Sequence, residues 1–266
     1  MEPPHLFVSV VVYELDTTIL SQCLRSLESS IARCFLAKKL SVWSLTIVDN
    51  GNNGDSLAAF ETENIRIVKN QYNVGYGAAH NQTIMDSASE FHLILNPDVT
   101  MDVDYVSKTI ELLTNNTDIV LTGPRGFMSD GSDAYLCKRY PSLLVLFVRG
   151  LKHWWTYSAF EQNLAQYEYH ELLNSEPSEV ELLSGCCMFA RTQALKDIGG
   201  FDEEFFLYFE DFDLSLRIRE VGRIVHLPTA KIIHLGGNSA AKGPHHIRLF
   251  VQSAIRFFQK HGWKII

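Results

Sequence analysis

The chain has 266 residues, of which 46% are hydrophobic and 20% charged, a composition typical of a globular protein with a substantial core. Its formal net charge of -8 argues against a general nucleic-acid binder, because such proteins meet phosphates with an excess of lysine and arginine. The five cysteines form an odd set without CxxC spacing, so we expect buried thiols in a reducing cytoplasm rather than disulfides or a zinc knuckle.

The first residues predict a strand followed by a helix. Residues 6–13 form a valine-rich apolar run, which is typical of a strand buried in a parallel sheet. Asp16 can cap a helix whose apolar side chains recur at helical spacing. These side chains are Leu20, Cys23, Leu24, Leu27 and Ile31. The first run is too short for a signal peptide and residues 143–148 are too few to span a bilayer, so we expect neither export nor a membrane span.

Three further predicted strands lead to turn-forming polar residues. The strands are 45–48, 65–69 and 91–95. The first leads to Asp49, the second precedes a glycine loop at 73–77 and a helix through Met85, and the third stops at Asn96-Pro97-Asp98. Ligands of parallel sheets bind at the carboxyl ends of strands, where Asp49, the glycine loop and Asp98 would converge. Residues 6–100 are therefore predicted to be a nucleotide-binding half.

The middle of the chain, residues 124–181, is less regular and rich in aromatic residues. These include Trp154, Trp155, Tyr157, Tyr167 and Tyr169. We expect an insertion that covers the site or contacts an acceptor. Short strand pieces at 180–183 and 186–190 follow, and a helix is predicted over 211–221.

The C-terminal residues 245–261 predict an amphipathic helix. Its apolar positions are Ile247, Phe250, Val251, Ala254, Ile255 and Phe258. The favoured interpretation is a helix packed on the sheet, because such stripes usually face the core. The alternative is a membrane-surface helix. Basic residues in the middle of the chain keep a peripheral membrane contact open, namely Lys138, Arg139, Arg149 and Lys152.

Two acidic clusters and one histidine indicate the chemistry. The clusters are Asn96-Pro97-Asp98 and residues 209–213, and His234 follows a later apolar run. A strand-end carboxylate beside a histidine can hold a divalent cation against a diphosphate, and a carboxylate at a helix start can deprotonate a hydroxyl. This combination suits sugar transfer from a nucleotide donor.

Seven short motifs occur in an order that resembles a known family. They are Val11-Val12-Tyr13, Ile47-Val48-Asp49-Asn50, Asn73-Val74-Gly75-Tyr76-Gly77 with Asn81, Leu95-Asn96-Pro97-Asp98, Ser184-Gly185-Cys186-Cys187-Met188, Gly199-Gly200-Phe201-Asp202-Glu203 and Glu210-Asp211-Phe212-Asp213. From residue 6 to about 240 the chain resembles the family-2 glycosyltransferases with a GT-A fold, and most of all their bacterial rhamnosyltransferase branch. The resemblance implies a single α/β domain over 1–266, with a Rossmann-like mixed sheet, helices on both faces, and an acceptor and catalytic half at 101–240.

The resemblance also implies a metal site. The family binds Mg²⁺ or Mn²⁺ and the donor diphosphate through a DxD motif, in which Asn96 here replaces the first acid. Asp98 and His234 are therefore the expected metal ligands, with phosphates and waters completing the octahedron. An alternative for His234 is a structural histidine that satisfies a buried partner.

By the same resemblance, nucleotide-sugar binding falls to the first half of the chain. The expected residues are Val11, Tyr13, Asp49, Gly75, Tyr76, Asn81, Asn96, Pro97 and Asp98. Asp49 would accept a hydrogen bond from the base, and Asn81 would support the glycine loop. An Asx turn with Asn50 and Gly51 is the alternative for Asp49, and both roles are compatible.

Catalysis is assigned to the acidic helix start. Asp211 matches the family's base, which takes the proton of the acceptor hydroxyl, and Glu210 is expected to orient it or to contact acceptor hydroxyls. Asp213 is expected to support the following helix. Gly185 and Cys186 would line the acceptor pocket. A base opposite the leaving nucleotide inverts the anomeric centre without a covalent intermediate.

The leading hypothesis is transfer of L-rhamnose from dTDP-rhamnose to a lipid-linked glycan of O-antigen or capsule type, in the cytoplasm or at the inner face of the plasma membrane. Other donors considered are UDP-galactofuranose, UDP-glucose and UDP-N-acetylglucosamine. A catalytically silent nucleotide-sugar-binding subunit is a different class, against which Asp98, Asp211 and His234 argue. A nucleotidyltransferase is a third class, and it would usually have a glycine-rich loop with a basic residue directly after the first strand. Residues 13–18 are neither glycine-rich nor basic, which argues against this class.

Overall fold

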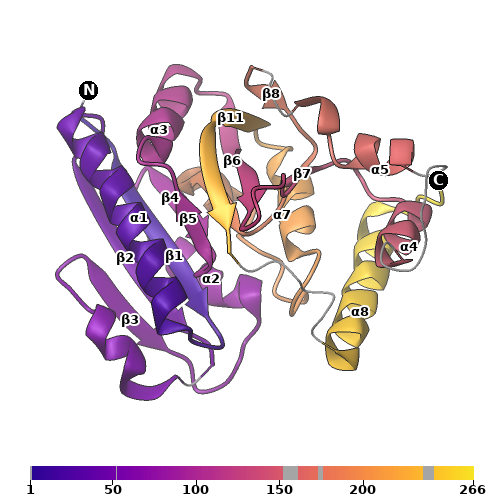
Figure 1. Cartoon of the computed structure of the whole chain (residues 1–266), viewed down its shortest axis with the longest axis horizontal. Helices are drawn as coiled ribbons and strands as arrows, with labels where there is room; N and C mark the ends of the chain where they lie inside the picture. Colours follow the sequence, from indigo (N-terminus) through magenta and orange to yellow (C-terminus); the bar gives the residue numbers. More distant parts are fainter. Residues whose placement is uncertain (1, 52, 152–160, 173–175, 236–242) are drawn as a thin grey trace.

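A computed structural model describes residues 2–51, 53–151, 161–172, 176–235 and 243–266 (Figure 1). The predicted contributions of Lys152, Trp154, Trp155 and Tyr157 lie outside these residues.

Eleven strands are present in the described part of the chain. They are β1 (His5–Val12), β2 (Val42–Asp49), β3 (Ile65–Lys69), β4 (Phe91–Leu95), β5 (Val99–Met101), β6 (Ile119–Met128), β7 (Cys137–Lys138), β8 (Ser178–Glu179), β9 (Leu182–Leu183), β10 (Cys187–Arg191) and β11 (Arg223–His234). The helices are α1 (Thr17–Leu36), α2 (Tyr76–Ile84), α3 (Tyr105–Asn115), α4 (Leu143–Leu151), α5 (Glu161–Tyr167), α6 (Thr192–Asp197), α7 (Glu210–Ile218) and α8 (Pro244–His261), with 3₁₀ turns η1 (Gly54–Phe60) and η2 (His170–Leu172).

One mixed sheet joins the two predicted halves of the chain. Its strand order is β3-β2-β1-β4-β10-β6-β11-β5, and β8 pairs with β11. The strands β3, β2, β1 and β4 run parallel, whereas β10 is antiparallel to both β4 and β6. The β4–β10 pairing is therefore the seam at which the predicted nucleotide-binding half meets the predicted catalytic half.

Helices cover both faces of the sheet, because successive side chains of a strand point to opposite faces. On β4, Leu93 and Leu95 belong to the core cluster that also contains the buried side chains of α1 and α3. Ile94 belongs to the second cluster, which contains side chains of α2, α6 and α7. The predicted Rossmann-like mixed sheet with helices on both faces is thus confirmed.

Several local predictions are confirmed by the structure. The Asp16 side chain accepts hydrogen bonds from Thr18 N and Ile19 N and caps α1, and the five predicted apolar residues of that helix are buried. The strands β3 and β4 have the predicted bounds, and β2 is longer at its start. All five cysteines are free and buried. The sequence reading missed α3 and most of β6, for which it made no prediction.

The predicted C-terminal helix exists as α8, but the expectation that it packs on the sheet is wrong. Its buried Phe257 and Phe258 contact Phe205 and Phe209, which precede α7. The helix therefore packs on the segment that leads into the predicted catalytic residues. Among the described helices, none combines the length and the apolar character that a bilayer crossing requires.

Gly75 generates a prediction about the glycine loop. Its φ is +94° and ψ 167°, and an added Cβ would lie 2.7 Å from the Phe206 carbonyl oxygen. We expect Gly75→Ala to destabilise the protein by about 1 kcal/mol or more beyond the backbone strain alone, as measured by urea unfolding. The matched control is Gly243→Ala, because Gly243 has φ +88° and ψ 179° but, its two chain neighbours aside, no atom of the described residues lies within 4 Å of the added Cβ. Equal losses would contradict the predicted clash.

Candidate active site

The turn after β4 meets the start of β10 at the centre of the sheet. Asn96 N donates to the Cys186 carbonyl at 2.8 Å, which continues the antiparallel β4–β10 pairing by one residue. This contact brings the predicted donor turn, Asn96-Pro97-Asp98, next to the predicted acceptor residues Gly185 and Cys186. Two motifs about 90 residues apart in sequence thus lie together where β4 ends and β10 begins.

Asp98 and His234 lie together beside this seam. Antiparallel pairing of β5 with β11 places His234 opposite Val99, and His234 Nε2 lies 3.2 Å from Asp98 Oδ1. Both side chains are partly exposed. Two neighbouring ligands of an octahedral Mg²⁺ lie about 3 Å apart, so this spacing fits a shared cation. No cluster of three or more His, Cys, Asp or Glu side chains that could hold a metal occurs among the described residues.

Tyr76 links the predicted donor turn, through Gly185, to the Asp211 carboxylate. Its hydroxyl lies 3.0 Å from Asn96 Oδ1 and 2.6 Å from the Gly185 carbonyl oxygen, and it can donate its proton to either. Gly185 N in turn donates to Asp211 Oδ2 at 2.8 Å. Burial raises the pKa of Tyr76 most, and the charges of Glu210, Asp211 and Asp98 raise it further. All three carboxyl groups therefore act electrostatically on the same hydroxyl.

The adjacent carboxyl groups of Glu210 and Asp211 have different environments. Asp211 accepts hydrogen bonds from Gly185 N and Phe212 N, whereas Glu210 Oε2 is buried without a hydrogen-bond partner among the described residues. Burial, and then the Asp211 charge, raises the pKa of Glu210 well above its usual range. Burial also raises the pKa of Asp211, but the two N–H groups and the Arg149 charge oppose this increase. Asp211 is consequently the better carboxylate and Glu210 the better neutral acid.

The backbone that enters α7 is strained. Tyr208 and Phe209 both have positive φ, at 70° and 63°, which is uncommon for residues other than glycine. Helix α8 holds this segment in place: Ser253 Oγ donates to the Leu207 carbonyl at 2.7 Å, and the Tyr208 hydroxyl lies 2.8 Å from His246 Nδ1. Such strain is found where surrounding contacts fix a functional conformation.

Asp213 fastens α7 to α8, which fits its predicted supporting role. It is fully buried, and its carboxylate contacts Arg217 Nε at 2.7 Å, Lys260 Nζ at 2.7 Å and His261 Nε2 at 2.8 Å. A buried carboxylate with several cationic partners supports structure rather than proton transfer.

At the nucleotide end, the Asp49 side chain forms the predicted Asx-type turn. Its carboxylate accepts hydrogen bonds from Gly51 N, Asn53 N and Asn53 Nδ2. A contact to the base stays a prediction. Tyr13 follows β1 and is exposed, and its carbonyl approaches Gly51 so closely that no Cβ fits there. Val11 is buried with Val48 under the glycine loop.

Asn50, which was not among the predicted site residues, holds the glycine loop in place. Its side chain donates to Asn73 Oδ1 at 2.7 Å and to the Gly75 carbonyl at 3.1 Å, so it ties the end of β2 to the glycine loop. The position of Asn50 directly after the predicted Asp49, at the end of a strand, was the sequence signal that could have pointed to this residue. Asn81, predicted to bind the nucleotide sugar, instead uses both amide protons on the Phe201 carbonyl and Glu203 Oε1. Asn81 therefore holds α2 against residues 201–203, and a contact to the nucleotide sugar stays a prediction.

The middle segment approaches the site through Tyr167 and Arg149. Tyr167 is buried, and the Asp211 charge contributes to the raised pKa of its hydroxyl.

Lys138 cannot contact a membrane, which corrects the expectation that it contributes to a peripheral membrane contact. Its side chain is buried and forms an ion pair with Glu168 at 3.1 Å. Cys186 is also buried, and its raised pKa fits an inert wall residue.

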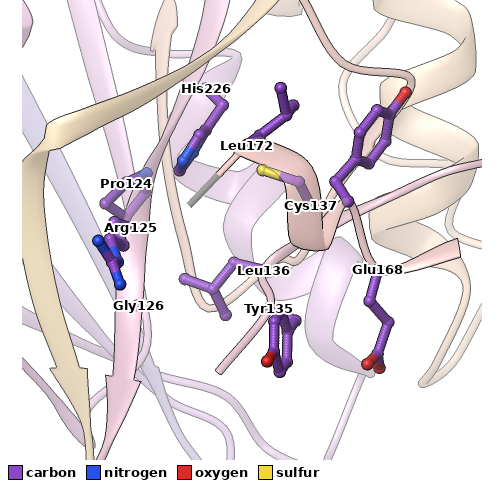
Figure 2. A pocket seen from close by; sticks show the side chains of 10 residues that line it. Pro124, Arg125, Gly126, Tyr135, Leu136, Cys137, Glu168, Leu172 and His226 are labelled. Carbon is purple, nitrogen blue, oxygen red and sulfur yellow. The ribbon is translucent and has the colours of Figure 1, made fainter. Parts of the chain in front are cut away.

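A small cavity near the Lys138–Glu168 pair is not the reaction site. Its volume is about 20 Å³, and its lining includes Cys137, Glu168 and His226 (Figure 2). This space holds one water at most and is too small for a sugar. Burial lowers the pKa of His226 to about 4, so this histidine is neutral at physiological pH.

A family model described as glycosyl transferase family 2 matches residues 10–199, which is more than half of the chain. The chain belongs to glycosyl transferase family 2. This membership confirms the predicted family and establishes the protein as a glycosyltransferase.

One relative of known name is similar to this chain over most of its length. An N-acetylglucosaminyl-diphospho-decaprenol L-rhamnosyltransferase of Mycobacterium tuberculosis is 29% identical over 259 residues, both in strain H37Rv and in strain CDC 1551. The alignment covers 89% of this chain and 81% of the relative.

Solved structures with little sequence identity share the fold. GalNAc-T7 with UDP, GalNAc and Mn²⁺ is 13% identical with a TM-score of 0.69, over 97% of this chain and 48% of that one, so this chain spans about half of its length. The mannosyltransferase PcManGT of Pyrobaculum calidifontis with GDP-Man and Mn²⁺ is 15% identical with a TM-score of 0.62, over 97% of this chain and 64% of that one. S. aureus TarS 1–349 with UDP-GlcNAc is 15% identical with a TM-score of 0.61, over 95% of this chain and 66% of that one. The likeness confirms the GT-A fold.

The environment of Glu210 predicts a pH dependence of stability. Because burial raises its pKa, ionising Glu210 costs folding free energy, and stability is lost as the pH rises from the ordinary value towards the raised one. Glu210→Gln removes this cost. We expect the thermal midpoint of the variant to exceed that of the wild type by more at about pH 8 than at about pH 5. A difference that stays constant with pH would contradict the assignment.

Proposed function

We propose that this glycosyltransferase transfers L-rhamnose from dTDP-rhamnose to a lipid-linked glycan of a bacterial surface polysaccharide, with inversion at the anomeric carbon. The observation that carries the catalytic part is the Asp211 carboxylate, held by Gly185 N and joined through Tyr76 to the donor turn. The sugar and the lipid-linked acceptor follow the name of the mycobacterial relative. The dTDP carrier follows the family resemblance.

In the proposed complex, the nucleotide lies along the first half of the sheet. The Asp49 turn and the glycine loop receive the base and ribose, and the diphosphate lies at Asp98 and His234. These two side chains would hold Mg²⁺ or Mn²⁺, and their 3.2 Å separation supports this assignment. When bound, the cation offsets the negative charge that grows on the departing diphosphate.

Asp211 is the proposed general base. Its carboxylate takes the proton of an acceptor hydroxyl as that oxygen bonds to the anomeric carbon, and the bond from this carbon to the dTDP oxygen breaks on the opposite face. The half-buried position keeps the pKa of Asp211 above the usual aspartate range, which strengthens it as a base. Glu210, neutral in its buried site, is proposed to orient acceptor hydroxyls.

Another donor is the main alternative within this function. Structures with the same fold contain UDP-GlcNAc or GDP-Man, and the pocket contacts that separate sugars vary on a common scaffold.

We further propose that the enzyme works as a peripheral protein at the inner face of the plasma membrane, where a lipid-linked acceptor is presented. No nucleic acid partner is proposed, because the net charge of -8 disfavours general binding to the phosphate backbone of nucleic acids.

The catalytic assignment is tested with Asp211→Asn and a panel of nucleotide sugars. We expect transfer to fall by about 10²- to 10⁴-fold while the thermal shift caused by the donor stays nearly unchanged, because only the proton acceptor is lost. The matched control is Asp213→Asn in the same helical turn, which should lower the thermal midpoint but retain most turnover per folded molecule. Wild-type turnover in Asp211→Asn would remove Asp211 as the base, and binding without turnover in the wild type would favour a silent subunit.

The metal assignment is tested with His234→Ala. We expect the Mn²⁺ or Mg²⁺ concentration for half-maximal transfer to rise at least about tenfold, because Asp98 alone remains as a protein ligand. The exposed His245 on α8 provides the control, and His245→Ala should leave the metal requirement unchanged. An unaltered requirement in His234→Ala would return His234 to a structural role.

A further inference from the structure

One flank of the molecule leaves large apolar side chains in water. Helices α4 and α8 lie there together, at the end of the molecule opposite β3 (Figure 1). Backbone hydrogen bonds from Leu143 N to the Lys264 carbonyl at 2.8 Å and from Leu144 N to the Ile265 carbonyl at 3.2 Å join the start of α4 to the C-terminal tail. We call the exposed apolar residues of this unit the flank: Leu143, Phe147, Ile247, Val251, Ile255 and Trp263.

The flank is not a by-product of loose packing. Ile247, Val251 and Ile255 recur at four-residue spacing on one side of α8 and are 44–62% exposed. Ser253 and Phe257, in contrast, are buried on the side of α8 that contacts Leu207 and Phe209 before α7. Helix α8 therefore has a complete core contact and a second apolar stripe beside it. Contiguous exposed apolar side chains of this kind mark an interaction surface.

The charge around the flank selects the partner. The whole chain carries -8, but residues 134–151 and 243–266 contain no aspartate or glutamate. Within the described part of the chain, Arg248 and Lys264 form no ion pair, whereas Arg256 and Lys260 pair with Glu204 and Asp202. Two copies of the chain would bring like charges together at this surface. An anionic surface complements it.

We propose that the flank binds an anionic lipid bilayer. Ile247, Val251 and Ile255 enter the boundary between headgroups and acyl chains, and Arg248 and Lys264 contact lipid phosphates. Because α8 also contacts the segment before Glu210, docking brings the catalytic residues close to the bilayer. The benefit to a lipid-linked acceptor rests on the proposed function, whereas lipid binding itself does not.

The test is co-sedimentation of the full chain, without donor or acceptor, with vesicles of phosphatidylcholine alone or mixed with phosphatidylglycerol. We expect binding to the mixed vesicles, weakened by salt. The triple variant Ile247→Ser, Val251→Ser and Ile255→Ser should bind at least about tenfold more weakly. The double variant Arg248→Glu and Lys264→Glu should lose a similar factor together with the salt dependence.

A matched control carries Leu36→Ser, Val42→Ser and Tyr72→Ser, which replace apolar residues of similar exposure at the other end of the molecule and should bind like the wild type. Circular dichroism and the donor-induced thermal shift check that every variant is folded, so loss of lipid binding is separated from failure of the proposed function. Absent binding by the wild type, or unchanged binding by both flank variants, would overturn the proposal. A dimer that the triple serine variant abolishes would do so too, because the flank would then bind a second copy.

Discussion

The peptide groups around Gly185 hold the candidate site together, because they bind side chains from both halves of the chain. The N–H of Gly185 donates to Asp211 and its carbonyl accepts from Tyr76. A Cβ at this position would lie 3.1 Å from Asp211 Cβ and 3.5 Å from the Tyr76 ring, so a larger residue would push the two apart. This arrangement requires the β4–β10 seam, which fixes Asn96 against Cys186.

Local environment gives the two adjacent carboxyl groups different roles. Asp211 accepts hydrogen bonds from the backbone of Gly185 and Phe212, whereas Glu210 Oε2 is buried without a hydrogen-bond partner among the described residues. Their positions depend on the strained residues Tyr208 and Phe209, and the strain persists because Phe209 packs against Phe257 of α8. The C-terminal helix thus helps to position the proposed catalytic residues, although it contributes no proposed catalytic group itself.

The fold itself leaves the sugar open. Proteins with 13–15% identity and the same fold were crystallised with different nucleotides and sugars, so the scaffold does not dictate the donor. What the scaffold does provide is a fixed meeting point of the 96–98 turn and the Asp211 carboxylate, which are linked through Tyr76 and Gly185. Differences among sugars are decided by side chains around this point, where small changes in contact have large effects on relative rates.

Much of this protein could be read from its sequence, because strand and helix periodicity, the Asp16 cap and the turn residues act over a few residues. The same holds for the types of group in the site, an acid at a strand end and an acidic pair at a helix start. Only the tertiary structure decided that Tyr76 bridges to Gly185, that Asn81 and Lys138 are used internally, and that α8 clamps the segment before α7. These outcomes depend on partners more than 25 residues away, and no local pattern encodes which of several polar groups will be desolvated together.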